Sequence, residues 1–223
     1  MKNAKTISDA AAGIQFEDDL FAEKGSQIGF WTAMETFLVC PNAYKSRSGF
    51  ERATEASKAR RWPVRLRGTG GGAVPQGPSV DNLVLAFDAP ENFSFEEGYR
   101  LIVGVVRAGL GEMGGDLLSG GVAGSFCDGA WNLSVNGKKV VGTAQRWRPR
   151  RCGPPRVLVH AMILTKDDVH PGVEAVCAFH DDMDLGLINP QSHTSLESSF
   201  DLRDLPVASF NAAARAALES LHH

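Results

Sequence analysis

The sequence predicts an α/β protein of the α+β kind, with a mixed, largely antiparallel central sheet flanked by helices. Two observations lead to this class. Segments with helical periodicity alternate along the chain with short β-prone runs, which is typical of a layered domain of helices and sheet. An Asn-Gly pair at 136–137 stands between two β-prone runs near the middle. This pair favours the type I′ turn that joins antiparallel strands, so a doubly wound parallel sheet is not expected.

Four segments carry helical signals. Ser94 and Glu97 form an S-x-x-E capping box, and the apolar residues that follow recur at helical spacing. Another helical segment ends before Pro63, because the residue before a proline resists helical geometry. Ser209 is expected to cap the last helix. The expected helices cover residues 8–24, 48–61, 94–110 and 209–223.

Short runs rich in β-branched and aromatic residues predict the strands. The expected strands cover residues 27–33, 35–40, 64–67, 81–87, 131–135, 138–147 and 157–164. The glycine-rich segment 111–124 is expected to be a loop, and His170, His180 and His193 are expected in loops too. Because the chain shows no internal repeat and no low-complexity linker, residues 1–223 are interpreted as a single domain.

Composition excludes several classes of protein. The net charge of −3 argues against non-specific nucleic-acid binding, which needs a basic surface. No apolar run reaches the ~20 residues of a membrane helix, and the N-terminus lacks the apolar core of a secretory signal. The four cysteines show no CxxC spacing, which fits neither a zinc site nor a disulfide framework. We therefore expect a cytoplasmic protein with reduced thiols and no membrane or nucleic-acid partner.

Residues 67–74 read RGTGGGAV, a stretch that is costly to order. Glycines permit positive φ and let a ligand lie directly on the backbone, where free N–H groups can hold an anion. The stretch is neither a P-loop nor a dinucleotide fingerprint, because the required residues and spacing are missing. A flexible turn is the alternative. We favour a ligand-binding loop because Arg67 stands at a strand exit, a strand resumes at Ala73, and a second unusual stretch follows at 124–148.

That second stretch reads GSFCDGAWNLSVNGKKVVGTAQRWR. Together, R-x-T-G-G-G-A-V and G-K-K-V-V-G-T-A-Q resemble the lipoate-protein ligase and octanoyltransferase superfamily, kin of the biotin ligases. The resemblance covers most of the chain and implies a catalytic domain of the biotin/lipoate ligase type. The segment around Cys127 looks most like the cysteine-dependent enzymes that move octanoyl groups between lipoyl carriers. The ligases usually show Asn-Asp in place of Trp131-Asn132, and they often carry a C-terminal accessory domain, which is not expected here.

The resemblance implies that Cys127 takes the acyl group as a thioester and that Lys139 contacts the acyl carbonyl. A thiol suits this role, because a nearby cation lowers its pKa from about 8.5. Alternation along the strand puts Lys138 and Lys139 on opposite faces, and Lys138 is expected in solvent. The structural alternatives are a buried small residue at Cys127 and a solvated edge lysine at Lys139. The expected catalytic residues are Cys127 and Lys139, and no metal ligand is expected.

The acyl tail is expected between the bare strand Gly142–Ala144 and the glycines 70–72. Burying about eight methylenes at ~0.8 kcal/mol each is enough to select a medium chain over acetate. His160 is a candidate wall or proton relay, although a lone histidine among apolar residues is usually a core side chain. Gln76 stands where many relatives have a histidine. The expected substrate-binding residues are Arg67, Thr69, Gly70, Gly71, Gly72, Ala73, Val74, Gln76, Gly142, Thr143, Ala144 and His160.

The resemblance also implies lipoyl-carrier domains as partners, either an H-type protein of the glycine-cleavage system or the acyltransferase subunits of dehydrogenase complexes. The basic segment 146–156 is either a solvated face or a docking patch for such an acidic carrier, whose association complementary charge would speed. Its arginines are Arg146, Arg148, Arg150, Arg151 and Arg156.

The predicted reaction is transfer of an octanoyl or lipoyl group to a carrier lysine through a cysteine thioester, with no cofactor. Two alternatives stay open. One is an ATP-dependent lipoate-protein ligase that uses ATP and magnesium and acts through an acyl-adenylate. The other is a non-catalytic protein that binds the acyl group or the carrier.

Overall fold

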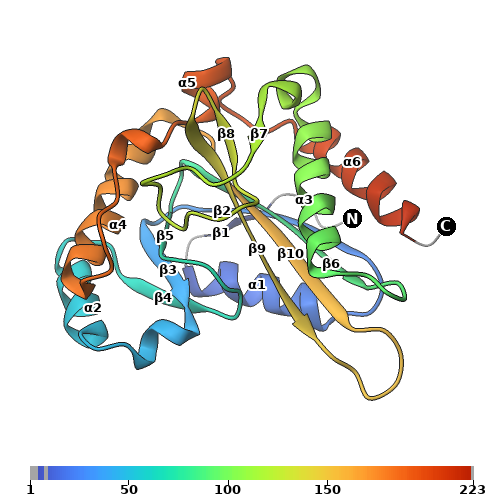
Figure 1. Cartoon of the computed structure of the whole chain (residues 1–223), viewed down its shortest axis with the longest axis horizontal. Helices are drawn as coiled ribbons and strands as arrows, with labels where there is room; N and C mark the ends of the chain where they lie inside the picture. Colours follow the sequence, from blue (N-terminus) through green and yellow to red (C-terminus); the bar gives the residue numbers. More distant parts are fainter. Residues whose placement is uncertain (1–4, 8–9, 222–223) are drawn as a thin grey trace.

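A seven-stranded sheet runs through the centre of the structure, a computed structural model that describes residues 5–7 and 10–221 (Figure 1). The strand order is β1-β2-β6-β10-β9-β8-β7. The β1–β2 pair is parallel, and the other neighbouring strands pair antiparallel. The strands are β1 (Lys5–Ile7), β2 (Gln27–Ala33), β6 (Val80–Asp88), β7 (Leu118–Ser119), β8 (Leu133–Val135), β9 (Lys138–Arg148) and β10 (Arg156–Leu164).

A smaller sheet of three strands has the order β4-β3-β5. It consists of β3 (Phe37–Pro41), β4 (Val64–Arg67) and β5 (Val74–Gln76). Strand β3 pairs parallel with β4 and antiparallel with β5. The prediction of a mixed, largely antiparallel α/β architecture is therefore confirmed.

Helices cover both faces of the large sheet. Helices α3 and α6 share one core with it, in which Gly109 lets the ring of Phe210 approach: an added Cβ would lie 2.5 Å from that ring. Helix α1 and the smaller sheet share the core on the other face, and α2 and α4 lie beside the smaller sheet (Figure 1). The helices are α1 (Ala10–Ala22), α2 (Phe50–Ala59), α3 (Phe95–Gly109), α4 (His170–Met183), α5 (Leu196–Phe200) and α6 (Val207–Ser220).

Short 3-10 turns connect several of these elements. They are η1 (Asn42–Ser46), η2 (Gly111–Asp116), η3 (Asp167–Val169) and η4 (Pro190–Ser192). Within the described residues, no helix has the length and apolarity needed to cross a membrane.

The strongest local signals are confirmed. Ser94 and Glu97 make both hydrogen bonds of the capping box at the start of α3. Asn136 and Gly137 have φ values of 51° and 74°, as the type I′ turn between β8 and β9 requires. The first predicted helix is α1, although residues 8 and 9 at its predicted start lie outside the described residues.

Three local predictions are wrong. Ser209 does not cap the last helix, because α6 begins at Val207 and contains Ser209. The segment 111–124 is not wholly a loop, since it contains η2 and β7. His170 and His180 lie in α4, whose first turn holds a proline. Proline is tolerated there, and Gly172 packs against the smaller sheet: an added Cβ would lie 2.7 Å from Pro75. Tertiary packing thus stabilises a helix that the Pro171-Gly172 pair made unexpected from the sequence.

Candidate active site

A pocket lies between one face of the large sheet and the smaller sheet, with α1 at its side. Residues from seven strands, the helix α1 and the segment before β8 meet there because the smaller sheet folds over β9, β10 and β6. The lining comprises Ile14, Glu17, Trp31, Val39, Arg67, Val74, Gln76, Asn82, Cys127, Lys139, Gly142, Thr143, Ala144, His160 and Met162. The structure therefore brings together residues that the sequence places more than 100 positions apart.

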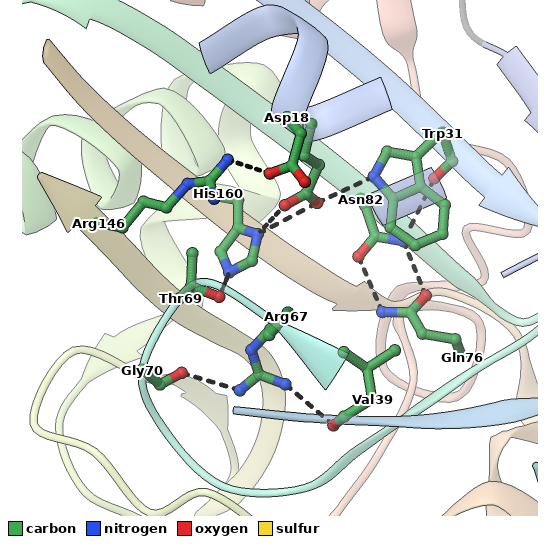
Figure 2. Close-up of polar contacts among 11 residues, drawn as sticks. Asp18, Trp31, Val39, Arg67, Thr69, Gly70, Gln76, Asn82, Arg146 and His160 are labelled. Atoms are coloured by element: carbon green, nitrogen blue, oxygen red, sulfur yellow. Dashed lines mark hydrogen bonds and ion pairs between the residues drawn. The ribbon is translucent and has the colours of Figure 1, made fainter. Parts of the chain in front are cut away.

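Arg67 holds the glycine loop in shape. Its buried guanidinium donates to the carbonyl oxygens of Gly70 and Val39, both at 2.9 Å (Figure 2). It also donates to that of Gly72 at 2.8 Å. Burial lowers the pKa of Arg67, and the nearby thiol of Cys127 opposes this shift. Arg67 thus binds the carbonyl oxygens of the glycine loop, and the N–H groups of the loop stay available for other partners.

One of those N–H groups meets the predicted nucleophile. The backbone N–H of Gly72 donates to the Sγ of Cys127 at 3.0 Å. Gly71 has φ 101°, and a Cβ there would lie 2.7 Å from the same sulfur. A side chain at position 71 would therefore both strain the backbone and displace the thiol, which is the physical reason for the bare stretch.

Lys139 lies beneath the same loop. Its side chain is fully buried, and its Nζ donates to the carbonyl oxygens of Phe126 at 2.7 Å and Cys127 at 3.0 Å. Burial lowers the pKa of Lys139 to about 8, and the Cys127 thiol and the Asp128 carboxylate act in the opposite direction. Lys138 is exposed, as the alternation along the strand predicts. Strand β9 therefore places the Lys139 ammonium against the backbone carbonyl of Cys127.

Two further residues hold the Cys127 segment, and the sequence analysis missed both. The buried Asn132 donates from Nδ2 to the carbonyl oxygen of Cys127 at 3.1 Å. His193 accepts the N–H of Phe126 on Nε2 at 3.1 Å and stacks on the Phe126 ring at 4.4 Å. Burial lowers the pKa of His193 to about 4, which keeps Nε2 free to accept. His193 was expected in a loop without a role, and its 67-residue separation from Phe126 gives no local signal.

His160 belongs to a polar cluster on one flank of the pocket (Figure 2). Its Nδ1 lies 3.0 Å from Glu17 Oε2, and its Nε2 lies 3.4 Å from the hydroxyl of Thr69. Trp31 also donates to Glu17, at 3.0 Å. Burial by itself would raise the pKa of Glu17. The charge of His160 and the hydrogen bonds from His160 and Trp31 together outweigh that effect, so the pKa of Glu17 is lowered. His160 therefore links α1 to the glycine loop from a pocket-lining position.

Gln76 is buried and pairs with Asn82 through two reciprocal amide hydrogen bonds of 3.0 and 2.8 Å (Figure 2). Asn82 also donates to the carbonyl oxygen of Trp31 at 3.3 Å. Both residues line the pocket. Ala73 and Val74 are buried where the glycine loop enters β5, and Val74 lines the pocket while Ala73 packs in the core beside it.

The basic segment 146–156 is largely committed to internal contacts, so a docking patch made of all five arginines is wrong. Arg156 is fully buried and donates to carbonyl oxygens of Leu20, Phe21 and Gly25. Arg146 forms an ion pair with Asp18, and Arg146 and Arg148 stack on Phe21, whose carbonyl also accepts a hydrogen bond from Arg148. Asp88 forms ion pairs with both Arg150 and Arg156. Arg151 and Arg148 are exposed.

The described cysteines are free thiols: Cys40, Cys127, Cys152 and Cys177. Burial raises the pKa of Cys40 to about 12, and burial also raises that of Cys177. Only Cys127 lines the pocket. Across residues 5–7 and 10–221, no group of three or more His, Cys, Asp or Glu side chains is placed to hold a metal ion.

Comparison with known proteins gives consistent matches. The family described as "Lipoyl protein ligase A/B catalytic domain" matches residues 23–218. An octanoyl-[GcvH]:protein N-octanoyltransferase of Kyrpidia tusciae is 48% identical over 86 residues, which make up 39% of this chain. That alignment covers 30% of the relative's own length.

Two solved structures show the same fold at low sequence identity. A T. acidophilum protein with bound lipoic acid has a TM-score of 0.69 and 14% identity, over 100% of this chain and 84% of its own. A lipoate-protein ligase A bound with ATP has a TM-score of 0.64 and 13% identity, over 100% of this chain and 86% of its own.

Proposed function

Because the chain belongs to the family of lipoyl protein ligase A/B catalytic domains, we propose that it transfers an octanoyl or lipoyl group to a lysine of a lipoyl-carrier domain through a thioester on Cys127. The observation that carries this proposal is the placement of the Cys127 thiol. The thiol accepts a hydrogen bond from the N–H of Gly72, and the Lys139 ammonium donates to the backbone carbonyl of Cys127. Both donors favour negative charge at the sulfur.

In the first half-reaction, the Cys127 thiolate attacks the acyl carbonyl of an acylated carrier. A carbon–sulfur bond forms, the bond from the carbonyl to the donor carrier breaks, and the leaving group takes up a proton. Lys139 and the backbone N–H groups beside Gly72 supply donors for the oxyanion that develops in between. In the second half-reaction, the amine of an acceptor lysine attacks the thioester, a carbon–nitrogen bond forms, and the carbon–sulfur bond breaks so that Cys127 leaves as a thiolate. The amine loses one proton to solvent, which balances the proton taken up by the first leaving group.

The relatives support a carrier of the H type. The K. tusciae enzyme is named for transfer from octanoyl-GcvH, an H-type carrier, and we propose a carrier of this kind as donor. The apolar part of the pocket suits a medium acyl chain, since Ile14, Val39, Val74 and Met162 line it. Each buried methylene contributes roughly 0.8 kcal/mol. This route needs no cofactor.

A lipoate-protein ligase is the second candidate, because the buried Lys139 ammonium and the N–H groups of the glycine loop also suit the anionic phosphate of an acyl-adenylate. In that case ATP and magnesium would supply the activation that the thioester supplies in the first route. The two candidates differ in whether Cys127 bears the acyl group.

Intact-mass analysis separates these candidates. The protein is incubated with an octanoyl-loaded carrier, and separately with octanoate, ATP and magnesium, each with an apo-carrier acceptor. We expect the mass of one octanoyl group on the wild-type protein in the first mixture only, followed by a modified acceptor. Cys127→Ser should abolish both, whereas Cys152→Ser, which changes an exposed thiol outside the pocket, should change neither.

Three results would contradict the proposal. Full transfer by Cys127→Ser would exclude the thioester. Modification that depends on ATP would support the ligase. An acylated protein that never modifies the acceptor would indicate a binding protein without turnover.

A further inference from the structure

One row of residues crosses four strands of the large sheet beneath the pocket. Gly142 of β9 pairs with Met162 of β10, Met162 pairs with Asn82 of β6, and Asn82 pairs with Trp31 of β2. All four line the pocket. Paired residues on neighbouring strands direct their side chains to the same face and are about 5 Å apart, so about 10 Å separates Gly142 from Asn82.

The reactive groups lie at the Gly142 end of this row. A Cβ at Gly142 would be 3.2 Å from Cε and 3.3 Å from Nζ of Lys139. The same Nζ binds the carbonyl of Cys127. An acyl group attached to the Cys127 sulfur therefore begins near Gly142 and has the row toward Asn82 in front of it.

The Gln76–Asn82 pair stands at the other end. Gln76 is 4% exposed and Asn82 is 3% exposed. Their amides bond to each other in both directions, and Asn82 bonds to the Trp31 carbonyl as well. The pair is thus satisfied without a ligand and needs no polar group from the acyl chain.

Beyond this pair the molecule is hollow again. Gln76 also lines a second cavity, together with Pro75 and Pro78. Asn82 and Trp31 also line a third cavity, which Met34 and Asp81 border. Gln76, Asn82 and Trp31 therefore form a wall at this end of the acyl pocket, and each of them also lines one of the other two cavities.

We propose that the Gln76–Asn82 amide pair sets the length of the acyl chain that the site accepts, an inference that rests on the proposed function. An extended chain of eight carbons covers roughly 9 Å, since each C–C bond of about 1.5 Å advances it by about 1.25 Å. This length matches the distance from Gly142 to Asn82. A longer chain would have to part the two amides and leave buried donors and acceptors unpaired, which is unfavourable.

The test compares transfer from octanoyl-loaded and dodecanoyl-loaded carrier protein. We expect the wild-type protein to transfer octanoyl at least about tenfold faster than dodecanoyl, because the well-packed wall does not yield to extra methylenes. Gln76→Ala/Asn82→Ala removes both amides and enlarges the pocket at this end. Its two rates should come within about threefold of each other. A structural defect alone would lower both rates without changing their ratio.

The matched control is Gln76→Met/Asn82→Leu, which keeps the side-chain volumes and removes the hydrogen bonds. A ratio equal to that of the wild type assigns the length limit to the bulk of the two side chains, and a ratio close to that of the alanine variant assigns it to their hydrogen bonds; either result supports the proposal. Should the double alanine variant lack a cooperative thermal transition, Gln76→Ala alone serves, because Asn82 keeps its bond to the Trp31 carbonyl. That single variant should still raise the relative rate of dodecanoyl transfer.

Equal wild-type rates for both chains, or an unchanged ratio in a folded alanine variant, would overturn the proposal. Calorimetric binding of free octanoate and dodecanoate to the same proteins separates this failure from failure of the proposed function. If no protein forms a thioester while the binding preference shifts in the alanine variant, the proposed transfer reaction is wrong. The proposal that Gln76 and Asn82 limit the chain length then still holds. If the preference is absent or does not shift, the wall is wrong.

Discussion

At the residue scale, Cys127 is held in a strained backbone conformation. Its φ of 49° lies in the left-handed region, which residues other than glycine rarely adopt. Such a conformation persists only where its surroundings over-determine it. Here Lys139 and Asn132 both bind the Cys127 carbonyl, His193 binds the preceding N–H, and Gly72 binds the sulfur. The thiol is therefore positioned before any substrate arrives.

The charge on Lys139 gives the proposed reaction a testable pH dependence. Burial lowers the pKa of this side chain to about 8, so its ammonium loses the proton as the pH rises through that value. We expect the rate of thioester formation at Cys127 to fall there, because the carbonyl and the oxyanion lose a cation. Lys139→Arg keeps its charge at higher pH and should move the falling limb upward, whereas Lys139→Met should be inactive.

Single-turnover mass spectrometry from about pH 6 to about pH 10 measures that limb. An identical limb in wild type and Lys139→Arg would exclude Lys139 as its source.

The free energy of unfolding should also depend on pH because of Lys139. The pKa of the folded state lies below the ordinary 10.5, so the unfolded chain holds more protons between about 8 and 10.5. The destabilising contribution of Lys139 is complete below pH 8 and is relieved as the pH rises through this interval.

At the scale of single elements, α3 shows how local chemistry specifies a boundary. The Ser94 hydroxyl accepts the N–H of Glu97, and the Glu97 carboxylate accepts the N–H of Ser94. These bonds satisfy donors that have no partner within the helix. Helix α6 has no such cap, since Pro206 precedes it, and Ser209 lies exposed in its first turn.

The two serines make a matched pair of substitutions. Ser94→Ala should lower the free energy of unfolding by about 1 kcal/mol, because it removes the side-chain acceptor of the cap. Ser209→Ala should change it by less than about 0.5 kcal/mol, as expected for an exposed residue inside a helix. Urea unfolding of both variants measures the difference. Equal effects would show that the capping box contributes nothing specific.

At the scale of the whole molecule, Arg156 ties together parts that are distant in the sequence. From the start of β10 it donates to carbonyl oxygens in the last turn of α1, to that of Gly25 before β2, and to Asp88 at the end of β6. The carbonyls of Leu20 and Phe21 lie at the negative end of the dipole of α1, which a cation complements. Arg156 thereby anchors α1, which supplies Ile14 and Glu17 to the pocket.

Removing this anchor should destabilise the whole fold. Arg156→Met leaves buried carbonyls without donors and Asp88 with one cation fewer, and it should cost roughly 3 kcal/mol of unfolding free energy. Arg151→Ala, on the same basic segment but exposed, should cost less than about 0.5 kcal/mol. Thermal and urea unfolding measure both. A stable Arg156→Met variant with weakened carrier binding would instead restore the docking interpretation of Arg156.

The sequence by itself determined the elements and motifs whose signals are short in range. The capping box, the Asn-Gly turn, the glycine run and the alternation that separates Lys138 from Lys139 each depend on residues a few positions apart. Their physical causes act within one turn or one strand, and the structure contains each feature where the sequence predicts it.

Only the tertiary structure decided which of these features meet. Gly72 and Cys127 are 55 residues apart, and His193 contacts a residue 67 positions away. Such contacts depend on strand order, register and packing of the smaller sheet, which no local pattern encodes. The same reason explains the misplaced arginines: charge in the sequence indicates a surface, whereas the fold provided buried carbonyls for Arg156 to bind. Local interactions determine where the helices and strands form, and burial between distant segments determines which of them pack together.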